Sequence, residues 1–375
     1  MTTILYLVAA VSGAAFLHPY LFYPLSLRFM RSRPLADGSG PRLTASLLFA
    51  AYNEERSLPA KLENIAAIKA LHPDLEVLAY SDMSTDATLD LLSARPDLLR
   101  VIPAAQRTGK ATGMRRMVDQ ARGEVCIFTD ANVLLNPGSV APLHDYVRNP
   151  EFGGVAGTLH YVNDDASATA EAGGIYWRME EAIKRLESRC GSIMGADGSI
   201  FATRRALYPQ VPPHLLDDMI ASMSVLFHGR RLISAPDVVA YERNATAAAD
   251  EFRRKRRIAC RAWNSYRHIR PSIARLPVSE RYKFISHKVV RWFGAPLLLL
   301  CGTALAAALW LDGCWTMLGG LVLASGMVVS AALARVRPAQ TLTGFAAAVF
   351  ATFVGVTDAW RGRTWQTWRP AASRD

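Results

Sequence analysis

The stretch Gly123-Glu-Val-Cys-Ile-Phe-Thr-Asp-Ala-Asn-Val-Leu-Leu-Asn-Pro137 predicts a buried strand that ends in a polar loop. Residues 125–128 are an apolar run typical of a strand, and the Asn-Pro pair closes the loop that follows. The strand delivers Asp130 and Asn132 to the edge where open α/β sheets bind ligands, and their oxygen atoms suit a hard divalent cation. A strand-ending aspartate can also cap the next helix, so this stretch alone leaves both interpretations open.

The apolar residues of the chain are concentrated at its two ends. The sequence has 375 residues and is 51% hydrophobic, which favours one soluble domain plus membrane segments over two soluble domains. We expect an N-terminal membrane anchor at residues 1–27, a linker at 28–42 and a C-terminal membrane region at 293–360. The residues between these regions have the composition of a soluble domain.

The charges near the apolar runs predict how the chain is oriented. The first run lacks a basic start and a small-residue cleavage site, so a retained anchor is favoured over a cleaved signal peptide. Arginines follow it at 28, 31 and 33, and a basic cluster spans 253–270, which places the central domain in the cytosol. The net charge of +11 is explained by a membrane surface and an anionic substrate, because no nucleic-acid-binding motif is present.

The C-terminal part of the chain leaves its topology open. Residues 271–292 form an interfacial region, in which 277–292 are expected to lie as a helix on the cytosolic leaflet. Two spans follow at 294–311 and 313–333, whereas 342–356 is short enough to be a span or a re-entrant segment. Three spans would put the basic tail, 361–375, outside, yet Arg361, Arg363 and Arg369 favour the inside.

Strands and helices alternate through the first part of the central domain, which predicts a parallel sheet. The expected strands are 43–50, 75–80, 99–102 and 123–128, and the expected helices run to about residue 71, from 87 to 94 and to 121. Three strand ends carry acidic or amide groups that would meet at one edge of the sheet. These groups are Asn53, Glu54 and Glu55, then Asp82, Ser84 and Asp86, then Asp130 and Asn132.

The lysine at 110 and the spacing of the cysteines indicate which kinds of binding site the domain can contain. The spacing around Gly109-Lys110 is not that of a phosphate-binding P-loop, but a lysine at a helix start can still meet a diphosphate. The five cysteines show no paired spacing of the metal or redox kind, which suits buried residues in a reducing compartment.

Taken in order, these motifs resemble those of family 2 inverting glycosyltransferases, whose membrane-bound branch includes cellulose, chitin, hyaluronan and exopolysaccharide synthases. The resemblance covers roughly residues 43–270. The matching stretches are Ala51-Tyr-Asn-Glu-Glu55, Ser81-Asp-Met-Ser-Thr-Asp86, Gly109-Lys110, Thr129-Asp-Ala-Asn132, Gly195-Ala-Asp-Gly198 and Leu216-Asp-Asp218. It implies an α/β GT-A fold with a Rossmann-like mixed sheet, one N-terminal transmembrane helix and two to three C-terminal ones.

The resemblance also implies how a UDP-sugar donor is bound. Asn53 and Glu55 would lie near the nucleobase and ribose, Asp82 would receive the uracil or ribose, and Lys110 the diphosphate. Asp130 would be the first acid of the family's D-x-D motif, in contact with nucleotide and metal. Asn132 stands where the second acid is usual. Its neutral oxygen predicts weaker binding of Mg²⁺ or Mn²⁺ than two carboxylates would give.

The acceptor site is implied by the loop around Gly195, Asp197 and Gly198, where missing side chains would let a sugar approach the backbone. Without the other motifs, this loop would equally suit a tight turn before a strand. Asp218 is the candidate general base, with Asp217 raising its pKa or orienting it. Outside this context, the acidic pair would simply begin a helix.

The basic tract after residue 250 falls where many processive members carry Gln-x-x-Arg-Trp. Arg257 matches the arginine and could neutralise the leaving diphosphate, but Arg254 replaces the glutamine and Ile258 the tryptophan. Trp263 could stack on the acceptor sugar from a different angle. A polybasic helix at the membrane surface explains the same tract, and both interpretations can hold at once.

We therefore expect a hexosyl- or N-acetylhexosaminyltransferase of the bacterial inner membrane, with its catalytic domain in the cytosol. Its acceptor would be a growing polysaccharide or a lipid-linked glycan. Three or four spans enclose a narrow channel at best, so a second copy or a secretion partner is expected. The alternatives are a non-processive glycolipid glycosyltransferase and, in another class, an inactive nucleotide-sugar-binding scaffold or sensor.

Overall fold

Eight strands form one mixed sheet in the computed structural model, which describes residues 1–35, 38, 40–163 and 165–367. The strand order is β3-β2-β1-β4-β7-β6-β8-β5. The strands are β1 (Ala45–Ala51), β2 (Glu76–Ser81), β3 (Arg100–Pro103), β4 (Val125–Asp130), β5 (Leu134–Leu135), β6 (Phe152–Tyr161), β7 (Ile200–Arg204) and β8 (Arg231–Glu242). The first four strands in the chain are parallel, as expected, and their bounds lie within two residues of the predicted ones.

The second half of the sheet is where its direction changes. Strand β7 runs antiparallel to both β4 and β6, and β6 pairs with β8 in parallel. The sheet is therefore mixed, in agreement with the expected fold class.

Strand β4 lies at the centre of the core because both of its faces are covered. Val125 and Ile127 pack into the hydrophobic cluster on one face, and Cys126 and Phe128 pack into the cluster on the other. Successive strand residues point to opposite faces, so an unbroken apolar run is what a strand buried on both sides requires. The ring of Phe128 stacks on Phe201 of β7, with the ring centroids 4.6 Å apart.

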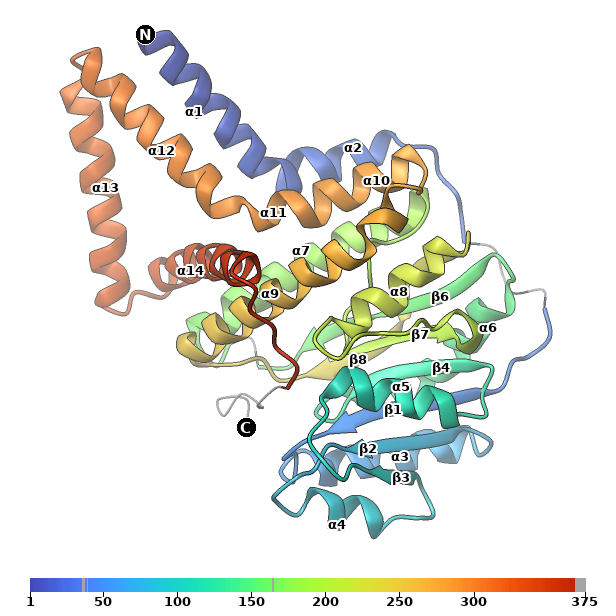
Figure 1. The fold of residues 1–375 in the computed structure, drawn as a ribbon. Helices are drawn as coiled ribbons and strands as arrows, with labels where there is room; N and C mark the ends of the chain where they lie inside the picture. Colours follow the sequence, from blue (N-terminus) through green and yellow to red (C-terminus); the bar gives the residue numbers. More distant parts are fainter. Residues whose placement is uncertain (36–37, 39, 164, 368–375) are drawn as a thin grey trace.

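Helices cover both faces of the sheet (Figure 1). One face packs against α3 (Leu58–Leu71), α4 (Thr88–Ser93) and α6 (Val140–Arg148). The other packs against α5 (Lys110–Gln120), α8 (Asp217–Phe227) and α9 (Ala248–Ile273). The long helix α7 (Ala168–Cys190) and two short 3₁₀ turns, η2 (Pro137–Ser139) and η3 (Arg205–Leu207), complete the domain.

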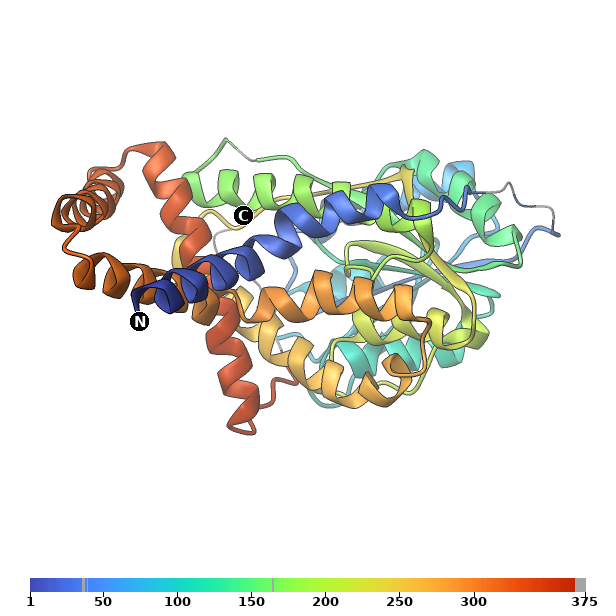
Figure 2. The same ribbon diagram turned by 90° about the horizontal axis from the view of Figure 1, so that it is seen from above.

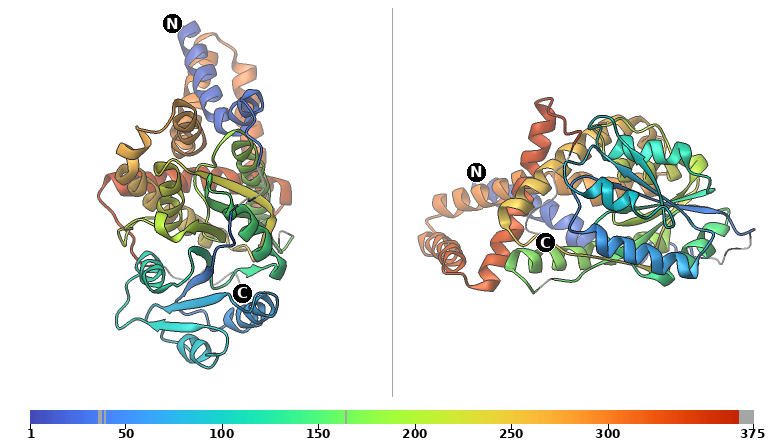
Figure 3. Two further views of the ribbon diagram at one scale, coloured as in Figure 1. Left: turned by 90° about the vertical axis from the view of Figure 1, so that its right-hand side faces the viewer. Right: turned by 90° about the horizontal axis from the view of Figure 1, so that it is seen from below.

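Four helices of the described residues are long and apolar enough to cross a membrane. The first is formed by α1 (Thr2–Leu17), η1 (His18–Phe22) and α2 (Tyr23–Phe29). The others are α12 (Gly294–Leu311), α13 (Trp315–Leu333) and α14 (Arg337–Trp360). Helices α1 and α12 lie side by side and project away from the sheet, at the end opposite to β2 and β3 (Figures 1 and 3).

Helix α14 differs from the other three in its direction and its contacts. It packs against α9 and α7 and runs across the direction of α1 and α12 (Figure 2). Near its end, both oxygens of the buried Asp358 accept hydrogen bonds from Arg256 of α9. The run at 342–356, for which a span and a re-entrant segment were both open, thus belongs to a helix that packs on the sheet domain.

The segment after α14 returns to the sheet domain. Gln366 donates a hydrogen bond from Nε2 to the carbonyl oxygen of Thr108, at 3.1 Å, so this segment contacts the sheet domain. The side of the membrane on which the tail lies stays a prediction. Arg369 and the rest of the tail, like parts of the linker at 36, 37 and 39, lie outside the described residues.

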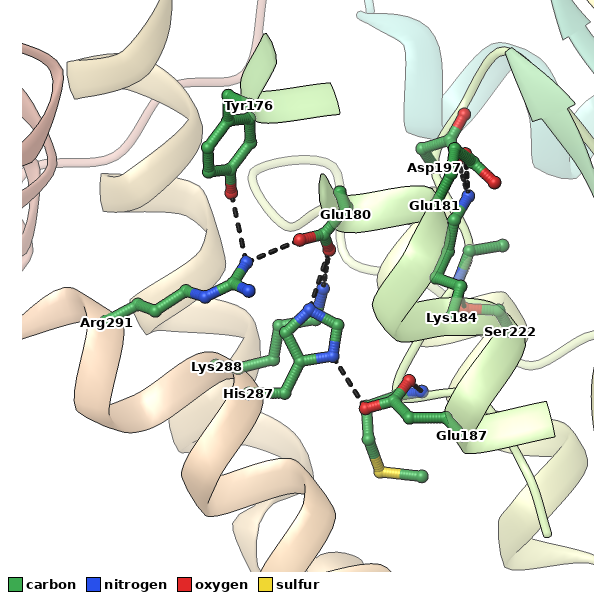
Figure 4. A network of polar contacts seen from close by, with 12 residues as sticks. Tyr176, Glu180, Glu181, Lys184, Glu187, Asp197, Ser222, His287, Lys288 and Arg291 are labelled. Carbon is green, nitrogen blue, oxygen red and sulfur yellow. Dashed lines mark hydrogen bonds and ion pairs between the residues drawn. The ribbon is translucent and has the colours of Figure 1, made fainter. Parts of the chain in front are cut away.

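The interfacial region consists of α10 (Val278–Phe284), η4 (Ile285–Val289) and α11 (Val290–Trp292), which follow one another without a break. The helix expected at 277–292 is therefore present, and its place on the cytosolic leaflet stays a prediction. Lys283, Ser286 and His287 are buried, and the segment packs against α7 (Figure 4).

Candidate active site

The loops after β1 and β2 are tied together by side chains predicted to bind the donor. Asn53, in a left-handed conformation at φ 53°, accepts a hydrogen bond at Oδ1 from the backbone N–H of Thr85, at 2.9 Å. Glu55 accepts at Oε2 from the N–H of Ala87, at 3.1 Å. Both side chains therefore lie at the predicted sheet edge, where they brace neighbouring loops and remain partly or fully exposed.

Asp82 holds the next loop in place. Its side chain is completely buried, and its two oxygens accept hydrogen bonds from the N–H groups of Thr108 and Gly109, at 2.7 and 2.9 Å. A carboxylate that accepts backbone N–H groups is firmly oriented. Asp82 thus shapes the turn that precedes Lys110, and its contact with the uracil or ribose stays a prediction.

Lys110 and Asp130 form an ion pair between the start of α5 and the end of β4. The distance from Lys110 Nζ to Asp130 Oδ1 is 2.6 Å. Burial opposes the charge of Lys110, but the carboxylates of Asp130, Asp217 and Asp218 together raise its pKa. Lys110 is therefore a fixed cation, suited to a diphosphate.

Gly198 marks the point at which the separate motifs meet. A Cβ atom placed on Gly198 would lie 2.8 Å from Lys110 Nζ, 3.5 Å from Asp218 Oδ2 and 3.6 Å from Asp130 Oδ2. Residues that are 20 to 108 positions apart in the sequence thus surround one glycine. The absent side chain leaves the space between a cation and two carboxylates open. The approach of a sugar to this glycine stays a prediction.

The acidic pair begins α8, and its two members have different surroundings. Asp217 is 4% exposed, and its Oδ1 lies 4.0 Å from Nη2 of Arg261. Asp218 accepts a hydrogen bond at Oδ1 from the N–H of Met219, at 2.7 Å, so its Oδ2 is left toward Gly198. Burial, followed by the charge of Asp217, raises the pKa of Asp218 to about 6. A carboxylate with this pKa is suited to accept a proton near neutral pH.

The expected metal ligands offer a limited set of oxygens. Among the described residues, no group of three or more histidine, cysteine or acidic side chains is placed to hold a metal ion. Asn132 donates its amide N–H to Glu242 Oε1, at 2.9 Å, and Asp130 Oδ1 is engaged by Lys110. Asp130 Oδ2 and the amide oxygen of Asn132 fit a cation only if a donor diphosphate supplies further oxygens, as is common for Mg²⁺.

Helix α9 brings Arg261 next to the acidic pair, whereas the sequence motif pointed to Arg257. Arg261 is 4% exposed and donates a hydrogen bond to the carbonyl oxygen of Leu215, beside Asp217. It lies one helical turn after Arg257, which is half-buried on the same helix. The i, i+4 spacing within the basic tract was the signal that could have pointed to Arg261.

Trp263 lies in an aromatic cluster where α9 meets the apolar helices. Its ring centroid is 5.6 Å from that of Trp292, 5.7 Å from Trp360 and 5.8 Å from Phe293. Its predicted contact with an acceptor sugar thus competes with packing against other rings.

The loop between α7 and β7 carries the glycines predicted to line the acceptor site. Gly195 adopts φ +95°, a left-handed conformation that favours glycine. Asp197 Oδ2 lies 3.0 Å from Nζ of Lys184, a buried residue of α7 that the sequence did not single out (Figure 4). Burial works against the charge of Asp197, but Lys184 holds its pKa below the usual value.

Part of the chain matches a model of a known protein family. Residues 46–211 match the family model described as glycosyl transferase family 2, a range that includes Lys110, Asp130 and Gly198 and ends before Asp218. No curated protein shows a significant match to the sequence.

Among solved structures, the fold is similar to that of the mannosyltransferase PcManGT from Pyrobaculum calidifontis in complex with GDP-Man and Mn²⁺. The TM-score is 0.72 at 23% identity, over 96% of this chain and 100% of that chain. TarS residues 1–349 from S. aureus, in complex with UDP-GlcNAc, match at a TM-score of 0.43 and 16% identity over 85% and 92% of the two chains. Mannosyl-3-phosphoglycerate synthase from Rubrobacter xylanophilus matches at 0.42 and 15%, over 63% and 77%. The match to the family model is thus confined to residues 46–211, and the likeness to PcManGT shows that the chain has a GT-A fold.

Proposed function

We propose that this protein is an inverting glycosyltransferase that moves a sugar from a UDP-sugar to a growing polysaccharide or a lipid-linked glycan. The observation that carries the proposal is the meeting of Lys110, Asp130 and Asp218 around Gly198. A cation for a diphosphate and a base for a hydroxyl are the two groups that such a transfer needs on opposite sides of the reacting carbon.

In the proposed reaction, Asp218 Oδ2 takes the proton of an acceptor hydroxyl while that oxygen attacks the anomeric carbon of the donor sugar. The bond from this carbon to the diphosphate breaks, and Lys110 stabilises the charge that develops on the leaving group. Asp217 keeps the pKa of Asp218 high enough for proton transfer, and Arg261 fixes Asp217 in turn. Arg257 is proposed as a second cation for the diphosphate.

A divalent cation, Mg²⁺ or Mn²⁺, would be held by Asp130 with Asn132 and would add positive charge beside the leaving diphosphate. The structure of PcManGT contains Mn²⁺ and a nucleotide-diphosphate sugar. Since that donor is GDP-linked, the nucleotide itself has to be determined by experiment.

We place the protein in the bacterial inner membrane as a multi-pass protein, with its catalytic domain in the cytosol. The four apolar helices and the basic residues near them support this placement. A second copy or a secretion partner remains part of the proposal for a polysaccharide product.

A second candidate is the transfer of a single sugar to a lipid-linked acceptor. It is favoured by Trp263, which contacts the rings of Tyr266, Trp292, Phe293 and Trp360. A tryptophan engaged in this way is a poor platform for a sliding glycan, and Ile258 stands where processive members carry their tryptophan.

The test is a screen of UDP- and GDP-sugars with membranes that contain the purified protein, in which nucleotide release and product size are followed. We expect one UDP-sugar to give acceptor-dependent UDP release that is lost on chelation of divalent cations. A product of many sugars supports the polysaccharide acceptor, whereas a single added sugar supports the second candidate. Donor binding with no transfer under any condition would contradict both and favour a sensor or scaffold.

A further inference from the structure

The loop that carries Gly195 and Gly198 is fastened by side chains from outside it. We call residues 191–198, between α7 and β7, the acceptor loop. Strand β8 holds its start, through Arg231 Nε to the Gly191 carbonyl oxygen and through two hydrogen bonds between Leu232 and residues 192–193. Other elements add Lys283 Nζ to the Ser192 carbonyl oxygen at 2.7 Å, Met194 N–H to Glu187 Oε2 at 3.0 Å, Lys184 Nζ to Asp197 Oδ2 at 3.0 Å, and Ala196 N–H to Ser222 Oγ at 3.0 Å. The bond from Lys283 comes from the interfacial segment 278–292. The bond from Met194 goes to Glu187, which also contacts His287 of the same segment.

Lys283 connects this segment directly to the start of the acceptor loop. Its side chain is completely buried, and Nζ is also 2.8 Å from Glu280 Oε2. A Cβ atom on Gly191 would lie 2.9 Å from Lys283 Nζ and 2.5 Å from Glu280 Oε1, so α10 and the loop are in close contact. A buried ammonium group is costly unless its partners are well placed, and here one partner is a backbone carbonyl of the loop.

His287 acts on the loop through Glu187. Its Nδ1 lies 2.7 Å from Glu187 Oε1 and its Nε2 lies 2.8 Å from Glu180 Oε1 (Figure 4). The ring of His287 thus lies between two carboxylates, one of which contacts the acceptor loop. The second oxygen of Glu187 accepts the N–H of Met194, so one carboxylate joins the interfacial segment to the acceptor loop.

The same carboxylate also contacts the N-terminal membrane helix, because the hydroxyl of Tyr23 donates to Glu187 Oε1. At its other end, segment 278–292 continues into α12 after Phe293. Two of the four apolar helices are thus linked to the acceptor loop through a few buried polar groups.

We propose that Lys283 and His287 are positioning residues for the acceptor loop, through which the interfacial segment sets the affinity for the acceptor. This inference rests on the proposed function. Neither residue lies among those that surround Gly198, so donor binding should not depend on them. A purely structural role would instead lower all activities together with stability.

The test compares Lys283→Met and His287→Gln with the wild-type, full-length protein in vesicles, using a synthetic octyl glycoside of the donor sugar as the acceptor probe. Lys288→Met is the matched control, since Lys288 lies in the same segment and pairs with Glu180 at 3.1 Å but with no residue of the loop. We measure the KM for the probe, the KM for the donor and hydrolysis of the donor without the probe. Hydrogen exchange of peptides covering 191–198 follows the loop itself.

We expect Lys283→Met to raise the KM for the probe about tenfold or more. The reason is that the variant loses a hydrogen bond from a charged group, and such a loss changes an affinity by about this factor. His287→Gln should give a smaller rise, because a glutamine amide can still donate to one glutamate. Both variants should speed exchange in the loop, while donor KM and donor hydrolysis stay within about twofold of wild type, as in the control.

The inference is contradicted if either variant binds the donor normally and has an unchanged KM for the probe. This holds even if the other variant fails to fold. Equal losses for donor and probe contradict it as well. Wild-type protein that transfers no sugar contradicts the proposed function instead. The wild-type measurement thus separates the two failures.

Discussion

At the scale of single residues, the site depends on one carboxylate whose protonation is set by its neighbours. Asp218 is placed by a hydrogen bond from Met219 N–H, and its free oxygen faces Lys110 and Asp130 across Gly198. Burial and the charge of Asp217 disfavour its ionised form. The same surroundings that hold Asp218 therefore also tune it as a base.

The first prediction concerns pH. Because a general base must be deprotonated and burial with Asp217 raises the pKa of Asp218 to about 6, kcat/KM should fall as the pH drops through that value and be level above it. Replacing Asp217 by asparagine removes the neighbouring negative charge, so the acidic limb should move to lower pH. A pH–rate profile of both proteins checks this, and an acidic limb that stays in place in Asp217→Asn would be inconsistent with the coupling.

The second prediction concerns the glycine at the centre. In Gly198→Ala, the new Cβ would lie 2.8 Å from Lys110 Nζ, so the lysine has to move away from the diphosphate site. We expect transfer to fall by about 10²-fold, the scale of an ångström-sized misplacement in an active site. Gly344→Ala is the control, since its Cβ would meet Ala172 at an ordinary 3.7 Å. Equal activity of the two variants would argue against an active site at Gly198.

Some residues of the site could not be found from the sequence because their partners are distant in the chain. Lys110, Asp130 and Asp218 stand in ordered motifs at strand and helix ends, so their residue types and positions pointed to them. Lys184 and Arg261 lie in long helices that carry many other charges. Only the folded chain shows that they face Asp197 and Asp217.

At the scale of elements, the parallel first half of the sheet could be predicted and the mixed second half could not. Strands β1 to β4 are separated by helices and have apolar runs, which is the pattern of a parallel sheet. Strand β6 contains Gly153, Gly154 and Gly157, and β8 contains Pro236 and Asp237, all residue types that weaken a strand signal. Burial between the two helix layers overrides these local preferences.

The third prediction concerns the segment after α14. Gln366 reaches the turn before Lys110, and its carbonyl oxygen lies so close to Gly109 that a Cβ there would be 2.3 Å away. Gln366→Ala removes the bond to Thr108 and should raise the KM for the donor several-fold, about the effect of one lost hydrogen bond. The exposed neighbour Thr364, changed to alanine, serves as control. The measurement is the KM for the donor in both variants. A wild-type value in Gln366→Ala would show that the bond to Thr108 does not support donor binding.

At the scale of the whole molecule, the apolar helices and the sheet domain meet through α7, α9 and the interfacial segment. Helices α1 and α12 project from this junction, whereas α14 crosses it and packs on α9 (Figures 1 and 2). An ion pair between Arg256 and Asp358 joins α14 to α9, which is unusual for a helix surrounded by lipid. Hydropathy alone counts α14 as a span because it records length and composition and carries no information on packing.

The fourth prediction concerns topology. Because residues 361–367 contact the sheet domain, a reporter fused after the C-terminus should lie on the same side of the membrane as a reporter inserted in that domain. Cytosolic reporter activity in whole cells, compared with an export-dependent reporter at the same sites, measures this. Opposite sides for the two positions would contradict the arrangement of α14.

The most direct test of the central claim is sugar transfer by Asp218→Asn in the intact membrane protein, with Asp119→Asn on the exposed surface of α5 as the matched control. Asparagine keeps the shape of the side chain but cannot accept the proton of the hydroxyl. The account predicts that transfer falls by about 10²- to 10⁴-fold while donor binding is retained, and that the control is unaffected. Transfer at the wild-type rate by Asp218→Asn would contradict it.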